Sequence, residues 1–338
     1  GASFKGEAER FIFGAPLPVT DIVINPVDQA MYFTIGGRKT QSGLYRVTYT
    51  GNESTAPVTP QPDAGTELRE IRRNLETLHH AGATDAVATA WPYLGHADRT
   101  IRFAARIAIE HQPVATWQDR ALKETSSVDA KLTALLALTR CGSKDLQMSI
   151  VESMSQLKPE QLTESQFLSS GRVLGLCFIR MGEPDRETAN EISRVLNGFY
   201  PSKSPAVNRE LCRMLVYLND SEVAAKTLEL LAKAPSQEEQ IHYVYCLRAL
   251  KEHWTLSQRK EFFQWFVNTT THRGGHSFSG FIKNIRQEAI DRLTDAEKAE
   301  LKDVLEAQPT GTARLVEAAS RPAVQQWKVG DLLDAVEA

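Results

Sequence analysis

The sequence predicts a mainly α-helical protein, in which a solenoid of helical hairpins follows a small antiparallel β-sheet. Short runs rich in β-branched and aromatic residues fill residues 11–49. A stretch rich in proline, serine and threonine comes next, and from residue 66 almost every segment has helical periodicity. We therefore divide the chain into a β element (1–50), a linker (51–65) and a helical repeat domain (66–338).

Composition excludes several classes of protein. The chain has 338 residues, 42% of them hydrophobic and 24% charged, as folded globular proteins do. A net charge of −3 gives no electrostatic reason to expect nucleic acid or an anionic membrane surface as a partner. No run of eighteen apolar residues exists, so we expect no membrane span. The first residues lack the features of a signal peptide, and we expect an excised segment.

The β element should contain at least three strands. The runs 21–25, 30–35 and 43–49 alternate apolar and polar residues, and turn-forming residues separate them. Strands of this number and length make one sheet, such as a single propeller blade. One blade cannot bury both of its faces by itself, so we expect the sheet to need a partner.

The helical domain should contain many short helices joined by tight turns. Capping boxes are predicted at Thr163/Gln166, Ser236/Glu239, Thr255/Gln258 and Thr294/Glu297, and left-handed C-terminal positions at Gly142 and Gly182. Helices are predicted at residues 67–80, 83–93, 98–111, 115–124, 128–141, 144–156, 164–181, 185–198, 205–218, 221–233, 237–250 and 256–268.

A repeat is visible in the residues themselves. Residues 98–108 have an acid at the turn, arginine on the next turn and small residues where helices would approach, which is the HEAT pattern. Later versions begin at residues 131, 172, 209 and 242. With Arg102 as the first start, the intervals between successive starts are 29, 41, 37 and 33 residues. This scatter suits degenerate HEAT repeats, in which each hairpin closes the open apolar face of its neighbour.

The four cysteines agree with this interpretation. Cys177, Cys212 and Cys246 are 35 and 34 residues apart, about one repeat, while Cys141 lies one turn off that register. Equivalent positions on stacked repeats are about a helix–helix distance apart, which is too far for disulfides. We expect buried, reduced thiols. No C-x-x-C motif is present, so we expect neither structural zinc nor covalently attached haem.

The β element also resembles a known family. Residues 18–21, 30–33, 36–38 and 40–49 resemble the closing part of a glucose/sorbosone-dehydrogenase-like β-propeller. More narrowly, they resemble large multidomain proteins of planctomycetes, in which HEAT repeats follow the propeller and a c-type cytochrome domain ends the chain. Residues 273–277, 285–286 and 327–333 resemble segments that precede the haem domain in that family.

This resemblance implies a parent oxidoreductase. It would oxidise a sugar or alcohol in the periplasm, or otherwise outside the cytoplasm, and pass electrons to haem c. Pyrroloquinoline quinone with calcium would be its other cofactor. The present chain lacks most of the propeller and the C-x-x-C-H haem motif. We therefore expect the segment itself to be noncatalytic, with no cofactor of its own.

Five residues are candidates for an interdomain or anion contact. Arg38 follows two glycines, where a propeller could aim it at an anionic ligand, although a turn with a surface ion pair is the simpler interpretation. His272, Arg273 and His276 surround a glycine pair in a predicted loop. Two histidines are too few ligands for zinc, so docking of this loop through Arg273 and backbone groups competes with a metal or anion site. Trp327 lies in the family-like tail.

Three hypotheses about function remain open. The segment is a scaffold that joins a propeller dehydrogenase domain to a haem c domain. Alternatively, Arg38 or the loop 272–276 contributes to a redox active site that other domains complete. A free-standing HEAT adaptor that binds a protein partner is the third. In each case the expected partner is protein, from the same parent chain or another, with no nucleic acid and no membrane span.

Overall fold

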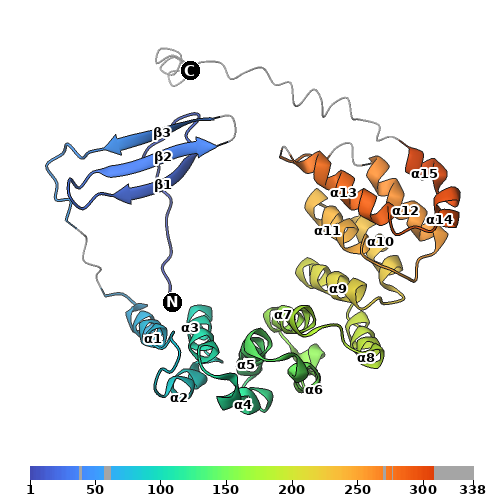
Figure 1. The fold of residues 1–338 in the computed structure, drawn as a ribbon, viewed down its shortest axis with the longest axis horizontal. Helices are drawn as coiled ribbons and strands as arrows, with labels where there is room; N and C mark the ends of the chain where they lie inside the picture. The colour runs from blue at the N-terminus through green and yellow to red at the C-terminus, as the bar shows by residue number, and fades with distance from the viewer. Residues whose placement is uncertain (38–39, 57–61, 269–271, 276, 308–338) are drawn as a thin grey trace.

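The computed structural model describes residues 1–37, 40–56, 62–268, 272–275 and 277–307 (Figure 1). These residues form a mainly helical protein with one three-stranded antiparallel sheet. This confirms the predicted mixture of a small sheet followed by helices.

The sheet comprises β1 (Val19–Ile24), β2 (Met31–Gly37) and β3 (Thr40–Val47), in the order β1-β2-β3. All three strands lie where the sequence predicts strands. A tight turn joins β1 to β2, in which the Gln29 N–H donates to the Asn25 carbonyl over 2.8 Å. Both outer strands are edges of the described sheet, so the middle strand alone is paired on both sides.

The two faces of the sheet differ in chemistry. Residues directly opposite each other in an antiparallel pair share a face, and Phe33 lies opposite both Ile22 and Tyr45. The register puts mostly apolar residues on that face, namely Val19, Ile22, Ile24, Met31, Phe33, Ile35, Tyr45 and Val47. The other face carries a polar group, in which Arg46 and the Tyr32 hydroxyl donate to the Asp28 carboxylate.

The helices follow the sheet without further strands in the described residues. The first group is α1 (Thr66–Glu76), α2 (Ala86–Ala90), α3 (Arg99–Glu110), α4 (Gln118–Leu122), α5 (Val128–Cys141), α6 (Gln147–Ser155), α7 (Glu164–Met181) and α8 (Arg186–Asn197). The second is α9 (Pro205–Tyr217), α10 (Val223–Lys233), α11 (Gln237–Leu247), α12 (Leu256–Asn268), α13 (Phe278–Ile290), α14 (Asp295–Glu300) and α15 (Lys302–Glu306). Short 3-10 turns precede α4 and α6 and follow α2.

The helices pack in a regular order. α3 packs against α1 and α5, α7 packs against α5 and α9, and α9 packs against α11. Each of α2, α4, α6 and α8 packs against the odd-numbered helix that follows it. Figure 1 shows the result as an arc, with α1, α3, α5, α7 and α9 on its inner side and α2, α4, α6 and α8 on its outer side.

Apolar side chains fill the space between successive helices in two adjoining clusters. One extends from α1 to α9, with Trp117 and Leu135 fully buried, and the other from the start of α7 to α15. The aromatic row of α12 belongs to the second cluster, since Phe262, Phe263 and Phe266 are buried. The prediction of buried, unpaired thiols is confirmed for three of the four cysteines and is wrong about the burial of Cys141. Cys177, Cys212 and Cys246 are buried and free, and Cys141 is free and partly exposed.

Most predicted helix starts are correct because side-chain caps fix them. Thr163 with Gln166 and Thr294 with Glu297 form complete capping boxes. The hydrogen bonds of a box are also present at Thr255 and Gln258. The box predicted at Ser236 is half formed. Ser236 accepts from the Glu239 N–H, but the Glu239 carboxylate accepts a hydrogen bond from the buried Tyr243 hydroxyl instead.

The two predicted glycine stops have different causes. Gly182 has φ 113°, a conformation that L residues rarely adopt, which confirms the prediction there. The prediction for Gly142 is wrong, because its backbone is extended, with φ −71° and ψ 162°. A Cβ at Gly142 would lie 2.6 Å from the Leu138 carbonyl oxygen. Close approach of the backbone, rather than a left-handed conformation, therefore requires glycine at 142.

The predicted helix at 83–93 is shorter and broken. Asp85 has φ 56°, a left-handed turn, so α2 begins only at Ala86. Pro92 has no N–H to donate to Ala88, and the chain tightens into the 3-10 turn Trp91–Tyr93. The other elements up to α12 follow the predicted ranges to within a few residues, whereas α13, α14 and α15 lie beyond the last predicted range, 256–268.

The first residues of the chain lie against the helices. Ala2 is fully buried in the first apolar cluster. Its N–H donates to the Asp98 carboxylate and its carbonyl accepts from Arg72, both over 2.7 Å. In the linker that follows the β element, Asp63 pairs with Arg69 over 2.5 Å. Residues 1–2 therefore belong with the helices in space, although we assigned them to the β element.

None of the described helices combines the length and the apolar composition needed to cross a bilayer.

Candidate functional site

Two of the five predicted contact residues can be placed. His272 and Arg273 precede α13, whereas Arg38, His276 and Trp327 lie outside the described residues. The Arg273 backbone is held by the first residue of α11. Its N–H donates to the Gln237 amide oxygen over 2.9 Å, and its carbonyl accepts from the Gln237 amide nitrogen over 2.7 Å. The loop therefore docks through backbone groups onto a helix of its own chain.

The His272 ring packs against an indole. Its centroid lies 5.4 Å from that of Trp265, and its Nδ1 atom is buried without a hydrogen-bond partner. Burial lowers the pKa of His272, and the nearby Glu238 only partly offsets this effect. The ring is therefore neutral at neutral pH and packs as an aromatic group, not as an anion-binding cation.

A metal centre has no support in the part of the chain that the structure describes. No three histidine, cysteine, aspartate or glutamate side chains gather there in a way that could hold an ion. The metal interpretation of the 272–276 loop thus gains no third ligand from the described residues.

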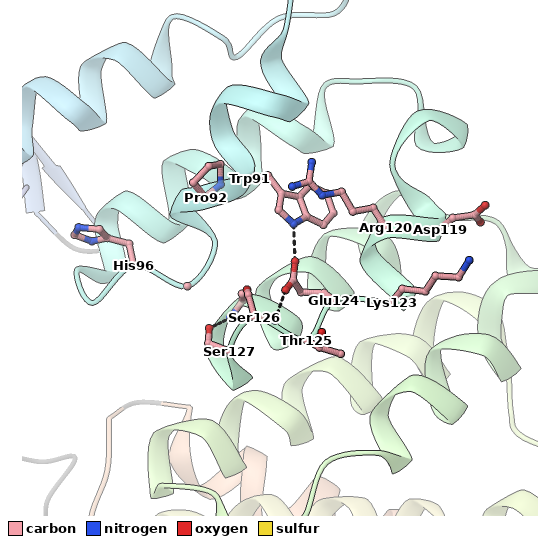
Figure 2. A pocket seen from close by; sticks show the side chains of 12 residues that line it. Trp91, Pro92, His96, Asp119, Arg120, Lys123, Glu124, Thr125, Ser126 and Ser127 are labelled. Atoms are coloured by element: carbon pink, nitrogen blue, oxygen red, sulfur yellow. Dashed lines mark hydrogen bonds between the residues drawn. The ribbon is translucent and has the colours of Figure 1, made fainter.

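Figure 2 shows a pocket of about 840 Å³ between the α2–α3 turn, α4 and the start of α5. Asp119 and Glu124 are the acids in its wall, and Arg120 lies over the Trp91 ring with its guanidinium carbon 4.3 Å from the ring centroid. Glu124 is only 8% exposed, and its carboxylate accepts hydrogen bonds from the Trp91 indole and the Ser126 N–H, over 2.5 and 2.6 Å. Burial raises its pKa, but the hydrogen bonds from Ser126 and Trp91 outweigh this and hold the pKa below its ordinary value.

This arrangement favours a structural role for Glu124. The carboxylate stays ionised at neutral pH, and its oxygens are already engaged with the donors that join three elements. A general acid would need the opposite, a raised pKa and a free oxygen facing substrate. Pocket volume alone therefore does not make this a catalytic site.

A second cavity combines charge and aromatic surface. It measures about 880 Å³ and lies among the α7–α8 connection, α9, α11 and the residue after α13. We call it the arginine–tyrosine groove. Its cations are Arg186, Arg213, Arg248, Lys251 and Arg292, its exposed aromatic rings are Tyr217 and Tyr245, and its two acids are Glu183 and Glu252.

Three cations of the groove have no ion pair among the described residues, namely Arg186, Lys251 and Arg292. The other two are paired with acids outside its wall, since Arg213 contacts Glu210 and Arg248 contacts Glu288 at 2.7 Å. The groove thus carries surplus positive charge on a chain whose net charge is −3.

The two tyrosines are rigid. Tyr217 stacks on Phe178 with 5.6 Å between ring centroids, and Tyr245 stacks on Phe281 with 5.9 Å. The Arg248 guanidinium carbon lies 3.5 Å from the centroid of the Tyr245 ring. Despite this packing, Tyr217 and Tyr245 remain 43% and 42% exposed. Burial, together with the nearby Glu183, raises the pKa of Tyr217, which stays a neutral hydroxyl donor at neutral pH.

Cys246 and His242 also border the groove, but they do not form a nucleophile and its base. The Cys246 sulfur lies 3.5 Å from His242 Nε2, and the same nitrogen lies 3.0 Å from the Arg209 carbonyl oxygen. Only an N–H can meet that oxygen, so Nε2 carries a proton and cannot accept one from the thiol. Hydrogen bonding with Cys212, together with burial, raises the pKa of Cys246, so it remains a thiol.

Sequence reasoning missed this groove. Its residues come from five elements spread over more than a hundred positions, and each one alone looks like ordinary helix surface. One signal was available. Arg140, Arg180, Arg213 and Arg248 recur near the ends of α5, α7, α9 and α11, at intervals of 40, 33 and 35 residues.

Comparison with known proteins does not assign a function to these sites. Neither a protein-family model, nor a curated protein, nor a solved structure matches this chain.

Proposed function

We propose that this chain is a noncatalytic scaffold, an α-solenoid of HEAT-type hairpins that carries a β-sheet for docking onto another β domain. The observation behind the proposal is the open apolar face of the sheet. Ile22 and Ile24 are 57% and 56% exposed and Tyr45 is 45% exposed, although all three surround the buried Phe33. Exposed apolar side chains that extend from one edge strand to the other are unusual on a surface that faces only water.

The occupant that fits this face is a second β-sheet. Sheets stack face to face about 10 Å apart, with side chains of the two inner faces interlocking. Covering a half-exposed aliphatic side chain stabilises the pair by about 1 kcal/mol, as part of the 1.5–3 kcal/mol for full burial. The opposite face carries the polar contacts of Asp28, Tyr32 and Arg46 beside the exposed Val23 and Leu44, so the more continuous apolar surface, that around Phe33, is the docking face we propose.

The helix order supports the repeat part of the proposal. Odd-numbered helices contact one another in sequence, and each outer helix supports its inner neighbour, as stacked hairpins do. In the family that the sequence resembles, the second β domain is a propeller and the far end of the helices meets a haem c domain. A periplasmic redox protein is accordingly the setting we propose.

Hydrogen exchange tests the docking. The amides of β1 and β3 should exchange quickly in this 338-residue chain and slowly in the complete gene product that contains it. In the complete product, Ile22→Glu should restore fast exchange, because a charge would be buried at the interface.

Leu44→Glu is the matched control. Leu44 is also aliphatic and even more exposed than Ile22, at 70% against 57%, but it lies opposite Thr34 and therefore on the polar face. It should leave the protection unchanged. Equal exchange in the chain and in the complete product, or equal effects of the two substitutions, would remove the docking proposal.

A further inference from the structure

We propose that the arginine–tyrosine groove binds an acidic peptide segment of a partner protein, in an extended conformation and with an aliphatic or aromatic side chain among its acids. This goes beyond the scaffold proposal, because the groove lies on α8, α9 and α11 and shares no residue with the sheet.

The charges of the groove set the sign of the ligand. Arg186, Arg292 and Lys251 have no carboxylate partner among the described residues, and they approach the groove from different elements. A guanidinium binds a carboxylate through two parallel hydrogen bonds, so side chains of glutamate or aspartate suit the two arginines. Binding of an acidic peptide would supply the carboxylate partners that these cations lack among the described residues.

The tyrosines provide the apolar part of the contact. Tyr and Arg are the residue types that most often carry the binding energy of protein interfaces. Tyr217 and Tyr245 are already held by stacking on Phe178 and Phe281, so they lose little freedom when a ligand covers them. A ring pre-positioned in this way offers a flat surface to a leucine or phenylalanine of the peptide.

The acids of the groove favour a peptide over a nucleic acid. Glu183 and Glu252 lie in the same wall as the cations. A peptide backbone brings N–H donors that can bind these carboxylates, whereas a phosphodiester chain brings a negative charge at every nucleotide and no backbone donor. The presence of acids among the arginines therefore matches a peptide.

The test uses this chain and three labelled probes in fluorescence anisotropy. The first is a peptide that alternates glutamate and leucine, the second is the same peptide with glutamine for glutamate, and the third is single-stranded oligothymidine. We expect the acidic peptide to bind, with an affinity that falls as salt is added because the charges are exposed. The glutamine peptide and the oligothymidine should not bind.

Two variants locate the binding. Reversing the two unpaired arginines, in Arg186→Glu with Arg292→Glu, should weaken binding of the acidic peptide about tenfold. The control reverses Arg99→Glu and Lys158→Glu, two exposed cations outside the groove that change the net charge by the same amount. It should bind the peptide as the unmodified chain does. Circular dichroism of both variants checks that the helices are intact.

Three results would overturn the proposal. The glutamine peptide could bind as tightly as the acidic one, the two double variants could lose affinity equally, or the oligothymidine could bind in place of the peptide. Loss of sheet docking in the hydrogen-exchange experiment would leave all of these readouts unchanged, so the two proposals fail separately.

Discussion

The indole N–H of Trp91 donates to the buried carboxylate of Glu124 over 2.5 Å, and so joins the turn after α2 to the end of α4. The two residues are 33 positions apart. The contact therefore links consecutive hairpins. Its loss should lower the free energy of unfolding by a measurable amount.

Glu124→Gln should destabilise the protein by about 2 kcal/mol at neutral pH, because charged acceptors make the stronger hydrogen bonds. The folded-state pKa of Glu124 lies below its ordinary value, since bonds from Ser126 and Trp91 outweigh the opposing effect of burial. The stability due to the charge is thus present above the ordinary pKa of about 4.3 and is lost as the pH falls through the lower folded-state pKa. Urea unfolding measures this effect. The difference in the free energy of unfolding between parent and variant should shrink as the pH falls through this range.

Glu152→Gln is the control for that experiment. Glu152 is exposed on α6, and its substitution should change stability by less than about 0.5 kcal/mol at every pH. A pH-independent deficit in Glu124→Gln would show that packing, not charge, holds the Trp91 contact.

Two glycines of the α7 region should respond to alanine in opposite directions. Gly175 lies inside α7, where a Cβ would meet only the Met214 sulfur at 3.7 Å, so Gly175→Ala should stabilise by about 0.5 kcal/mol. Gly182 has φ 113°, and Gly182→Ala should destabilise by about 2 kcal/mol through backbone strain. Thermal melts of the pair measure both. Equal shifts of the same sign would contradict the assigned backbone at Gly182.

Thiol titration should distinguish one cysteine that reacts in the native state from three that react only after unfolding. Cys141 is partly exposed and should react slowly with a disulfide reagent in the native state, since burial raises its pKa. Burial raises the pKa of Cys177 to about 11, and this thiol, like Cys212 and Cys246, should react only after unfolding. Cys141→Ser should abolish the native reaction. Rapid native labelling of a second cysteine would show that the helices open more easily than the packing indicates.

The purified chain should not oxidise sugars or alcohols. Such chemistry needs a cofactor that is held and oriented, and the sequence contains no C-x-x-C-H motif for haem c. A three-stranded sheet offers at most one wall of a quinone pocket, whereas a small-molecule site buries most of its ligand. Dye reduction is the assay, with pyrroloquinoline quinone and calcium added. Turnover above that of heat-denatured chain would refute the noncatalytic assignment.

Local signals made the elements of this fold predictable from sequence. Thr163 and Thr294 start helices because their hydroxyls bind backbone N–H groups three residues later, which the sequence spacing reveals directly. The same spacing misled us at Glu239, because Tyr243, one turn further along α11, offers its carboxylate another donor. At Gly142 the need for glycine comes from the Leu138 carbonyl, and sequence does not distinguish that need from a left-handed stop.

The candidate sites were less predictable than the fold. His272 and Arg273 were singled out as a site, yet the first packs on Trp265 and the second is bound through its backbone by Gln237. The groove was missed because Arg186 and Arg292 are brought together only by the stacking of α8, α9 and α11. A surface shared by several helices is set by the angles at which they pack, which no single helix encodes.

The contacts of Ala2 and Asp63 imply that the segment containing the sheet is attached to the helices at both of its ends. Ala2 is fixed to Asp98 and Arg72, Asp63 is fixed to Arg69, and both anchors lie on or beside α1 and α3. A domain held at both ends explores a smaller volume than one on a single linker, which raises its effective concentration near any surface within reach. A protease cut between β3 and α1 would therefore leave the sheet attached, and the two fragments should migrate together until the protein is unfolded.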